Sequence, residues 1–144
     1  MLVLRMPRVP RERTTVQERV IAAIETLDLT AIQRKLTNRT AGLGWSEVET
    51  SEAIRWYRRF LILRVLYPER QIAPSHAVDV VWRAHMLNTS QYAADCDCIF
   101  GAFLHHELNP KRGEGFSRAM LEGFAEAQVL SKLEFGVASP AIGG

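Results

Sequence analysis

The 144-residue sequence has only two cysteines, Cys96 and Cys98, and contains no CxxC pair. This excludes a zinc ribbon and a thioredoxin-type redox motif. On a helix, two side chains two positions apart point about 200° away from each other, which disfavours a disulfide between them. We therefore expect both thiols to be reduced.

Long apolar runs and the common catalytic motifs are also missing. No stretch approaches the roughly 18 apolar residues needed to cross a bilayer, and Met1–Met6 is too short for a secretory hydrophobic segment. The GxSxG, Walker A, dinucleotide-binding, HExxH and EF-hand patterns do not occur, which excludes the common hydrolase, nucleotide and calcium classes. We expect a cytoplasmic protein, with an organellar presequence as the alternative.

The sequence has almost no excess of charge of either sign, because it contains 18 Lys and Arg residues and 16 Asp and Glu residues. A net charge of +2 does not specifically indicate a nucleic-acid partner. The basic residues are nevertheless concentrated at the start, where four arginines and two prolines stand against one glutamate. Because proline disfavours helix in the residues before it, residues 1–13 are predicted to form a basic extended arm that orders on a protein partner.

The rest of the sequence shows the spacing of amphipathic helices and no convincing strand pattern. Apolar residues recur at i, i+3, i+4 and i+7 in six segments. These segments are residues 15–27, 28–36, 46–67, 75–87, 89–103 and 116–130. The pattern predicts an all-α fold, a compact single-domain bundle of about five to six helices over residues 14–136, with a flexible tail over residues 137–144.

Several helix starts carry recognisable capping residues. Thr15 with Glu18, and Ser46 with Glu49, fit the capping box in which each end of the pair bonds the backbone of the other. The helix that follows Ser46 is predicted to end at Pro68 and to carry a basic stripe, which we interpret as a solvated face. The stripe consists of Arg55, Arg58 and Arg59.

Residues 77–106 read AVDVVWRAHMLNTSQYAADCDCIFGAFLHH. This segment resembles the glycine-rich domain-containing protein-like family, whose pattern runs approximately V-D-x-x-W-H-x-H-x-L-x-T-x-x-Y-x-x-D-C-x-x-x-F-G-x-x-x-H-H. The preceding WYRRFLILRVLYP, residues 56–68, is similar to the aromatic helix of that family and its proline stop. The resemblance covers roughly residues 27–110 and implies a helical fold.

The sequence departs from the family pattern at three places. Arg83 stands where the family usually has histidine, and Glu107–Asn109 replaces a Pro-aromatic continuation. The glycine-rich tail of the plant relatives is reduced to Gly143 and Gly144, so the resemblance does not imply RNA binding through such a tail. The family has no well-defined biochemical activity, and the resemblance therefore implies a fold without implying a reaction.

Polar residues within the family motif suggest a site in the helical hairpin of residues 75–106. The candidates for a ligand site or a polar core are Asp79, Trp82, Arg83, His85, Tyr92 and Asp95. The candidates for a transition-metal site, which would supply imidazole and thiolate ligands, are His85, Cys96, His105 and His106.

Helical geometry places His85 on the same stripe as Val78 and Trp82, so we expect its ring to be buried. A buried histidine needs hydrogen-bond partners, and Tyr92, Asp95 or Asp79 could provide them without any metal.

Two functional hypotheses follow. The first is a protein-interaction or regulatory helical module that engages a partner through its basic arm or a helix face. The alternative is a small metal- or ligand-binding protein, or an enzyme, with a His/Asp/Cys site in the hairpin; its cofactor is unknown, and a transition metal is the candidate.

Overall fold

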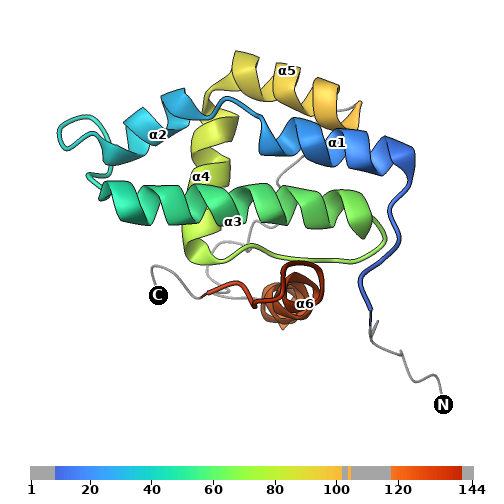
Figure 1. Cartoon of the computed structure of the whole chain (residues 1–144). Helices are drawn as coiled ribbons and strands as arrows, with labels where there is room; N and C mark the ends of the chain where they lie inside the picture. The colour runs from blue at the N-terminus through green and yellow to red at the C-terminus, as the bar shows by residue number, and fades with distance from the viewer. Residues whose placement is uncertain (1–8, 102–103, 105–117, 141–144) are drawn as a thin grey trace.

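Six helices follow one another in this computed structural model, which describes residues 9–101, 104 and 118–140 (Figure 1). They are α1 (Thr15–Glu25), α2 (Thr30–Thr37), α3 (Glu47–Leu66), α4 (His76–Leu87), α5 (Thr89–Phe100) and α6 (Arg118–Phe135). The described residues contain no strand, so the all-α prediction is confirmed. None of the described helices is long and apolar enough to cross a membrane.

The helices are arranged around α3, which packs against α1, α2, α4 and α6. Figure 1 shows α1, α2 and α5 on one side of α3 and α6 on the other, while α4 crosses behind α3. The three tyrosines of the chain, Tyr57, Tyr67 and Tyr92, are at most 1% exposed and lie in this core. Each carries a hydroxyl group into the interior, and each hydroxyl makes a hydrogen bond there.

The capping residues set the helix starts largely as the sequence predicts. The Ser46 hydroxyl accepts a hydrogen bond from the Glu49 amide at 3.1 Å, and α3 ends at Leu66, two residues before Pro68. The first capping box lies one residue earlier than predicted, because Thr14 pairs with Gln17. Thr14 has extended backbone angles, φ −73° and ψ 161°, which direct its side chain to the exposed amides of the first turn.

The basic stripe of α3 is only partly a solvated face, and this corrects the interpretation from sequence. Arg55 is exposed, but Arg58 is half-buried and donates hydrogen bonds to the carbonyls of Ile24 and Leu27 at 2.8 and 2.9 Å. These carbonyls lie in the last turn of α1 and just beyond it, where a helix leaves carbonyls short of donors, and among the described residues the Ile24 carbonyl otherwise accepts only the Leu27 amide at 3.3 Å. Arg58 therefore serves as the cap of α1, while Arg59 lies over the ring of Trp56.

The described part of the predicted arm, residues 9–13, has no helix and contacts the body of the fold through Arg11. The Arg11 guanidinium donates to the Leu66 carbonyl at 2.9 Å, pairs with Glu69 at 2.6 Å and lies over the ring of Tyr67. Its backbone amide donates to the Glu134 carboxylate on α6 at 3.0 Å. This segment thus joins the end of α3 to the last helix.

Candidate functional site

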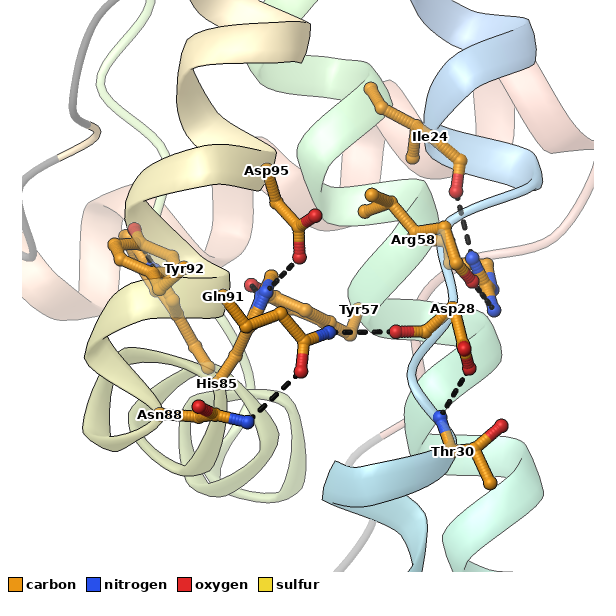
Figure 2. Close-up of polar contacts among 12 residues, drawn as sticks. Ile24, Asp28, Thr30, Tyr57, Arg58, His85, Asn88, Gln91, Tyr92 and Asp95 are labelled. Atoms are coloured by element: carbon orange, nitrogen blue, oxygen red, sulfur yellow. Dashed lines mark hydrogen bonds and ion pairs between the residues drawn. The ribbon is translucent and has the colours of Figure 1, made fainter.

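A chain of three polar side chains crosses the interface between α3, α4 and α5. The hydroxyl of Tyr57 lies 2.7 Å from Nδ1 of His85, and Nε2 of His85 lies 2.8 Å from Oδ2 of Asp95 (Figure 2). The His85 side chain is 2% exposed and Tyr57 is completely buried, whereas the Asp95 side chain is 22% exposed. The chain therefore runs from the core to the surface, and Asp95 forms its outer end.

The surroundings determine which form of the histidine is stable. Burial lowers the pKa of His85, while the hydrogen bond and the charge of Asp95 oppose that shift. Burial also raises the pKa of Tyr57 well above its usual value, so its phenol keeps its proton. A neutral ring then carries its proton on Nε2, donates it to the carboxylate and accepts the Tyr57 hydroxyl at Nδ1.

A second layer of aromatic side chains encloses the histidine. The Tyr92 ring meets the His85 ring edge-on at 4.8 Å, and the Tyr92 hydroxyl accepts a hydrogen bond from the Trp82 indole at 2.9 Å. The same hydroxyl donates to the carbonyl of Leu104. Cys96 is buried beside Tyr92 and is not bridged to any other cysteine. The Trp82 indole and the Tyr92 hydroxyl thus both have hydrogen-bond partners within the fold.

The structure brings His85, Asp95, Tyr92 and Trp82 together, whereas Arg83 pairs with Asp79. Arg83 donates to the Asp79 carboxylate at 2.8 Å, four residues away on the same helix, and is largely exposed. Arg83 is thus turned to the surface, whereas His85 of the same helix is buried. His105 and His106 are outside the described residues.

The described residues do not assemble a metal site. No group of three His, Cys, Asp or Glu side chains within the described ranges is close enough to hold an ion. Both ring nitrogens of His85 are engaged by Tyr57 and Asp95, and the Cys96 thiol lies in the core. A tyrosine, a histidine and a carboxylate in line resemble a proton relay, but a nucleophile must reach its substrate, and Tyr57 is enclosed on all sides.

Sequence reasoning missed Tyr57, which lies 28 positions before His85 on another helix. It also missed Gln91, whose side chain donates to the Asp28 carbonyl at 2.7 Å and ties α5 to the α1–α2 junction (Figure 2). The only available signal for Tyr57 was its place next to Trp56 in the aromatic helix. Helical spacing can show that a residue is buried, but it cannot show which residue of another helix it meets.

A largely apolar hollow on the described surface lies between α4 and the loop that follows α2. It has a volume of about 290 Å³, at the lower limit for a small-molecule pocket. Leu43 and Leu87 stand at this hollow and are 59% and 70% exposed. Leu36 and Ala84 are buried in its lining, and the remaining lining residues are Lys35, Ala41, Gly42, Val80 and Arg83. We call this hollow the α2–α4 groove.

The loop of the α2–α4 groove is held by its own hydrogen bonds. The Asn38 side chain accepts from the amides of Thr40 and Ala41, and the Asn38 carbonyl accepts from the amides of Gly42 and Gly44. A Cβ at position 42 would lie 1.7 Å from the carbonyl oxygen of Lys35, so the loop can pack this closely on α2 only with glycine there. Leu43 is therefore presented from a fixed backbone.

These features define an all-α domain with a closed polar core and an apolar groove on its surface. A family model described as UCP032817-like matches residues 19–116, and the chain belongs to this family. The chain is also 28% identical over 96 residues to glycine-rich domain-containing protein 1 of Arabidopsis thaliana, as the resemblance in the sequence predicts. The match covers 63% of this chain and 12% of the relative. No solved structure matches.

Proposed function

We propose that the protein is a helical protein-interaction module whose docking surface is the α2–α4 groove. The observation that carries this proposal is the pair of exposed leucines, Leu43 and Leu87, at one hollow with an apolar lining. Single exposed leucines are common on protein surfaces, but two at the same hollow create a site where a partner's side chain can be desolvated.

The alternative of a ligand site, a metal site or an enzyme in the hairpin of residues 75–106 receives less support. Its buried polar groups, His85, Trp82 and Tyr92, are all engaged in hydrogen bonds within the fold, which is the arrangement expected of a satisfied polar core. A larger hollow of about 580 Å³ lies between residues 69–71 and α6. Four of its seven lining residues are charged, namely Glu69, Arg70, Glu122 and Glu126, so it offers little apolar surface to an interface core.

The division of the chain and its location are part of the same proposal. We propose that residues 14–136 act as the interaction domain in the cytoplasm, with residues 1–13 as an arm and residues 137–144 as a tail. The contacts of Arg11 favour a different use of the arm from the one suggested by its sequence. They support a role in holding α6, because the guanidinium is already engaged by the fold.

Site-specific photo-crosslinking tests the proposed surface. A photoreactive side chain at position 87 should capture a defined partner in source cells, and Leu43→Asp in the same protein should abolish capture. Position 16 is the matched control, because Val16 is 65% exposed and lies on α1, which contributes no residue to the lining of the groove. Equal capture from both positions, or capture that survives Leu43→Asp, would refute a groove-centred interaction. Circular dichroism should show unchanged folding, since surface substitutions usually cost less than about 0.5 kcal/mol.

A further inference from the structure

We infer that the α2–α4 groove recognises an acidic amphipathic helix of a partner protein. The inference rests on the proposed interaction function and adds the chemistry of the partner. It combines the apolar lining of the groove, the basic residues at its edge and the fixed backbone of its loop.

The charges at the groove are predominantly positive. Lys35 and Arg83 line it, and Arg39 is exposed in the loop that carries Leu43. Lys35 has no ion-pair partner within the described ranges, whereas Arg83 is bonded to Asp79 through one of its nitrogens. Asp79 is thus the acidic group that faces Arg83 from the same helix. A guanidinium has five N–H donors, so Arg83 can bind a second carboxylate while it keeps Asp79.

The apolar part of the groove fits side chains better than it fits a free anion. A volume of about 290 Å³ is suited to a few aliphatic groups, and the buried Leu36 and Ala84 offer no hydrogen bonds from their side chains. An amphipathic helix supplies apolar anchors at i, i+3 or i+4 and i+7 together with charges beside them. A phosphate or a nucleic-acid backbone would use the basic edge and leave the leucines exposed.

The loop geometry favours recognition by a preformed surface. The Asn38 hydrogen bonds and the close packing of Gly42 on the Lys35 carbonyl hold Leu43 in place before a partner arrives. Little conformational freedom is then lost in the domain when it binds.

Fluorescence anisotropy of the full-length protein with labelled helical peptides tests the partner chemistry. Three peptides share the same leucine anchors and carry Glu, Gln or Lys at the flanking positions. We expect the Glu peptide to bind about threefold to tenfold more tightly than the Gln peptide, and the Lys peptide to bind most weakly. Added salt should reduce the preference for Glu, because partly exposed charge pairs are screened.

Variants of the domain separate the contribution of the basic residues from that of the exposed leucines. Lys35→Gln and Arg83→Gln should reduce the preference for the Glu peptide while the Gln peptide still binds, whereas Leu87→Asp should abolish binding of all three. Arg55→Gln removes an exposed arginine outside the groove lining and should change nothing. Equal binding of the Glu and Lys peptides, or a preference for Lys, would overturn the inference.

The outcomes also distinguish this inference from the proposed function. Partner capture at position 87 without a preference for the Glu peptide would retain the interaction module and reject the acidic helix. Absence of both capture and peptide binding would reject both. Self-association is measured separately by sedimentation equilibrium, where a mass of 16.3 kDa is expected. A dimer that is lost in Leu87→Asp would identify a second copy as the occupant and overturn the inference.

Discussion

The buried ring of His85 connects folding to pH. Because its pKa is lowered in the folded protein, the unfolded chain takes up a proton first as the pH falls. The stabilising contribution of the neutral ring is therefore complete above the unfolded value of about 6.5 and is lost as the pH falls below it. For one proton, the free energy of unfolding should decrease by no more than about 1.4 kcal/mol per pH unit.

Urea unfolding between about pH 5 and pH 8 measures this dependence. Subtracting the free energy of unfolding of His85→Gln from that of the wild type at each pH separates the contribution of the buried ring from that of the many carboxylates that titrate at lower pH. His76→Gln is the matched control, since His76 is an exposed histidine on the same helix. The same slope in the wild type and in His85→Gln would show that the pKa of the ring is the same in the folded and unfolded states, which would contradict the prediction.

At the scale of single residues, sequence could predict burial but not every partner. His85 falls on the apolar stripe of α4, so its burial could be predicted. Its contact with Asp95 follows from the tight hairpin that α4 and α5 form at Asn88. Tyr57 comes from a helix far earlier in the chain, and no spacing rule links it to His85. Arg58 shows the same limit, because a long side chain on a charged stripe can turn to a neighbouring helix end.

At the scale of helices, the C-terminal end of α1 depends on one side chain of α3. Arg58→Met should retain the aliphatic packing and remove the guanidinium donors of the Ile24 and Leu27 carbonyls, of which the Ile24 carbonyl keeps the Leu27 amide at 3.3 Å. We expect this to reduce the free energy of unfolding by about 1–3 kcal/mol. Arg55→Met removes an exposed arginine of the same helix and should cost no more than about 0.5 kcal/mol.

Chemical denaturation of the two variants measures the difference in their free energy of unfolding. Hydrogen exchange of the α1 amides shows which part of the helix is destabilised. Faster exchange should be concentrated in the last turn of α1 and the start of α2. Equal stability of the Arg58 and Arg55 variants would mean that water replaces the guanidinium at this helix end without cost.

Helix existence was predictable from sequence because apolar spacing and capping residues are local signals. The residue that caps the first helix was not predictable. Thr14 and Thr15 both stand three positions before a Gln or Glu that can complete a capping box, and only the backbone angles select between them. The groove was not predictable either. It depends on how closely the loop after α2 approaches α4, and that approach is set by tertiary packing and by the small size of Gly42.

At the scale of the whole molecule, Glu134 joins the beginning of the described chain to its last helix. Its side chain is completely buried, and Oε2 accepts from the Arg11 amide and from the Tyr67 hydroxyl at 2.5 Å. Burial and this carboxylate raise the pKa of Tyr67 to about 12. Glu134→Ala should therefore lower the pKa of Tyr67 in a spectroscopic titration. The pKa should stay above the usual value of tyrosine, because burial also raises it.

Limited trypsin digestion gives an independent measure of the same substitution. Glu134→Ala should release residues 9–13 and speed cleavage after Arg11 and Arg13, with a loss of about 1–3 kcal/mol in stability. Glu122→Ala is the control, because Glu122 is a largely exposed residue of α6 in a surface pair with Arg118. Unchanged cleavage in Glu134→Ala would show that the guanidinium contacts alone hold the segment.

The hydrogen bond between Arg11 and Glu134 spans 123 positions. A ribosome makes Arg11 more than a hundred residues before Glu134, so the Arg11 segment is synthesised long before the carboxylate that it binds. Until α6 has been synthesised, the Tyr67 hydroxyl and the Arg11 amide lack their acceptor. The contact between residues 9–13 and α6 can therefore form only after the whole chain between them has been made.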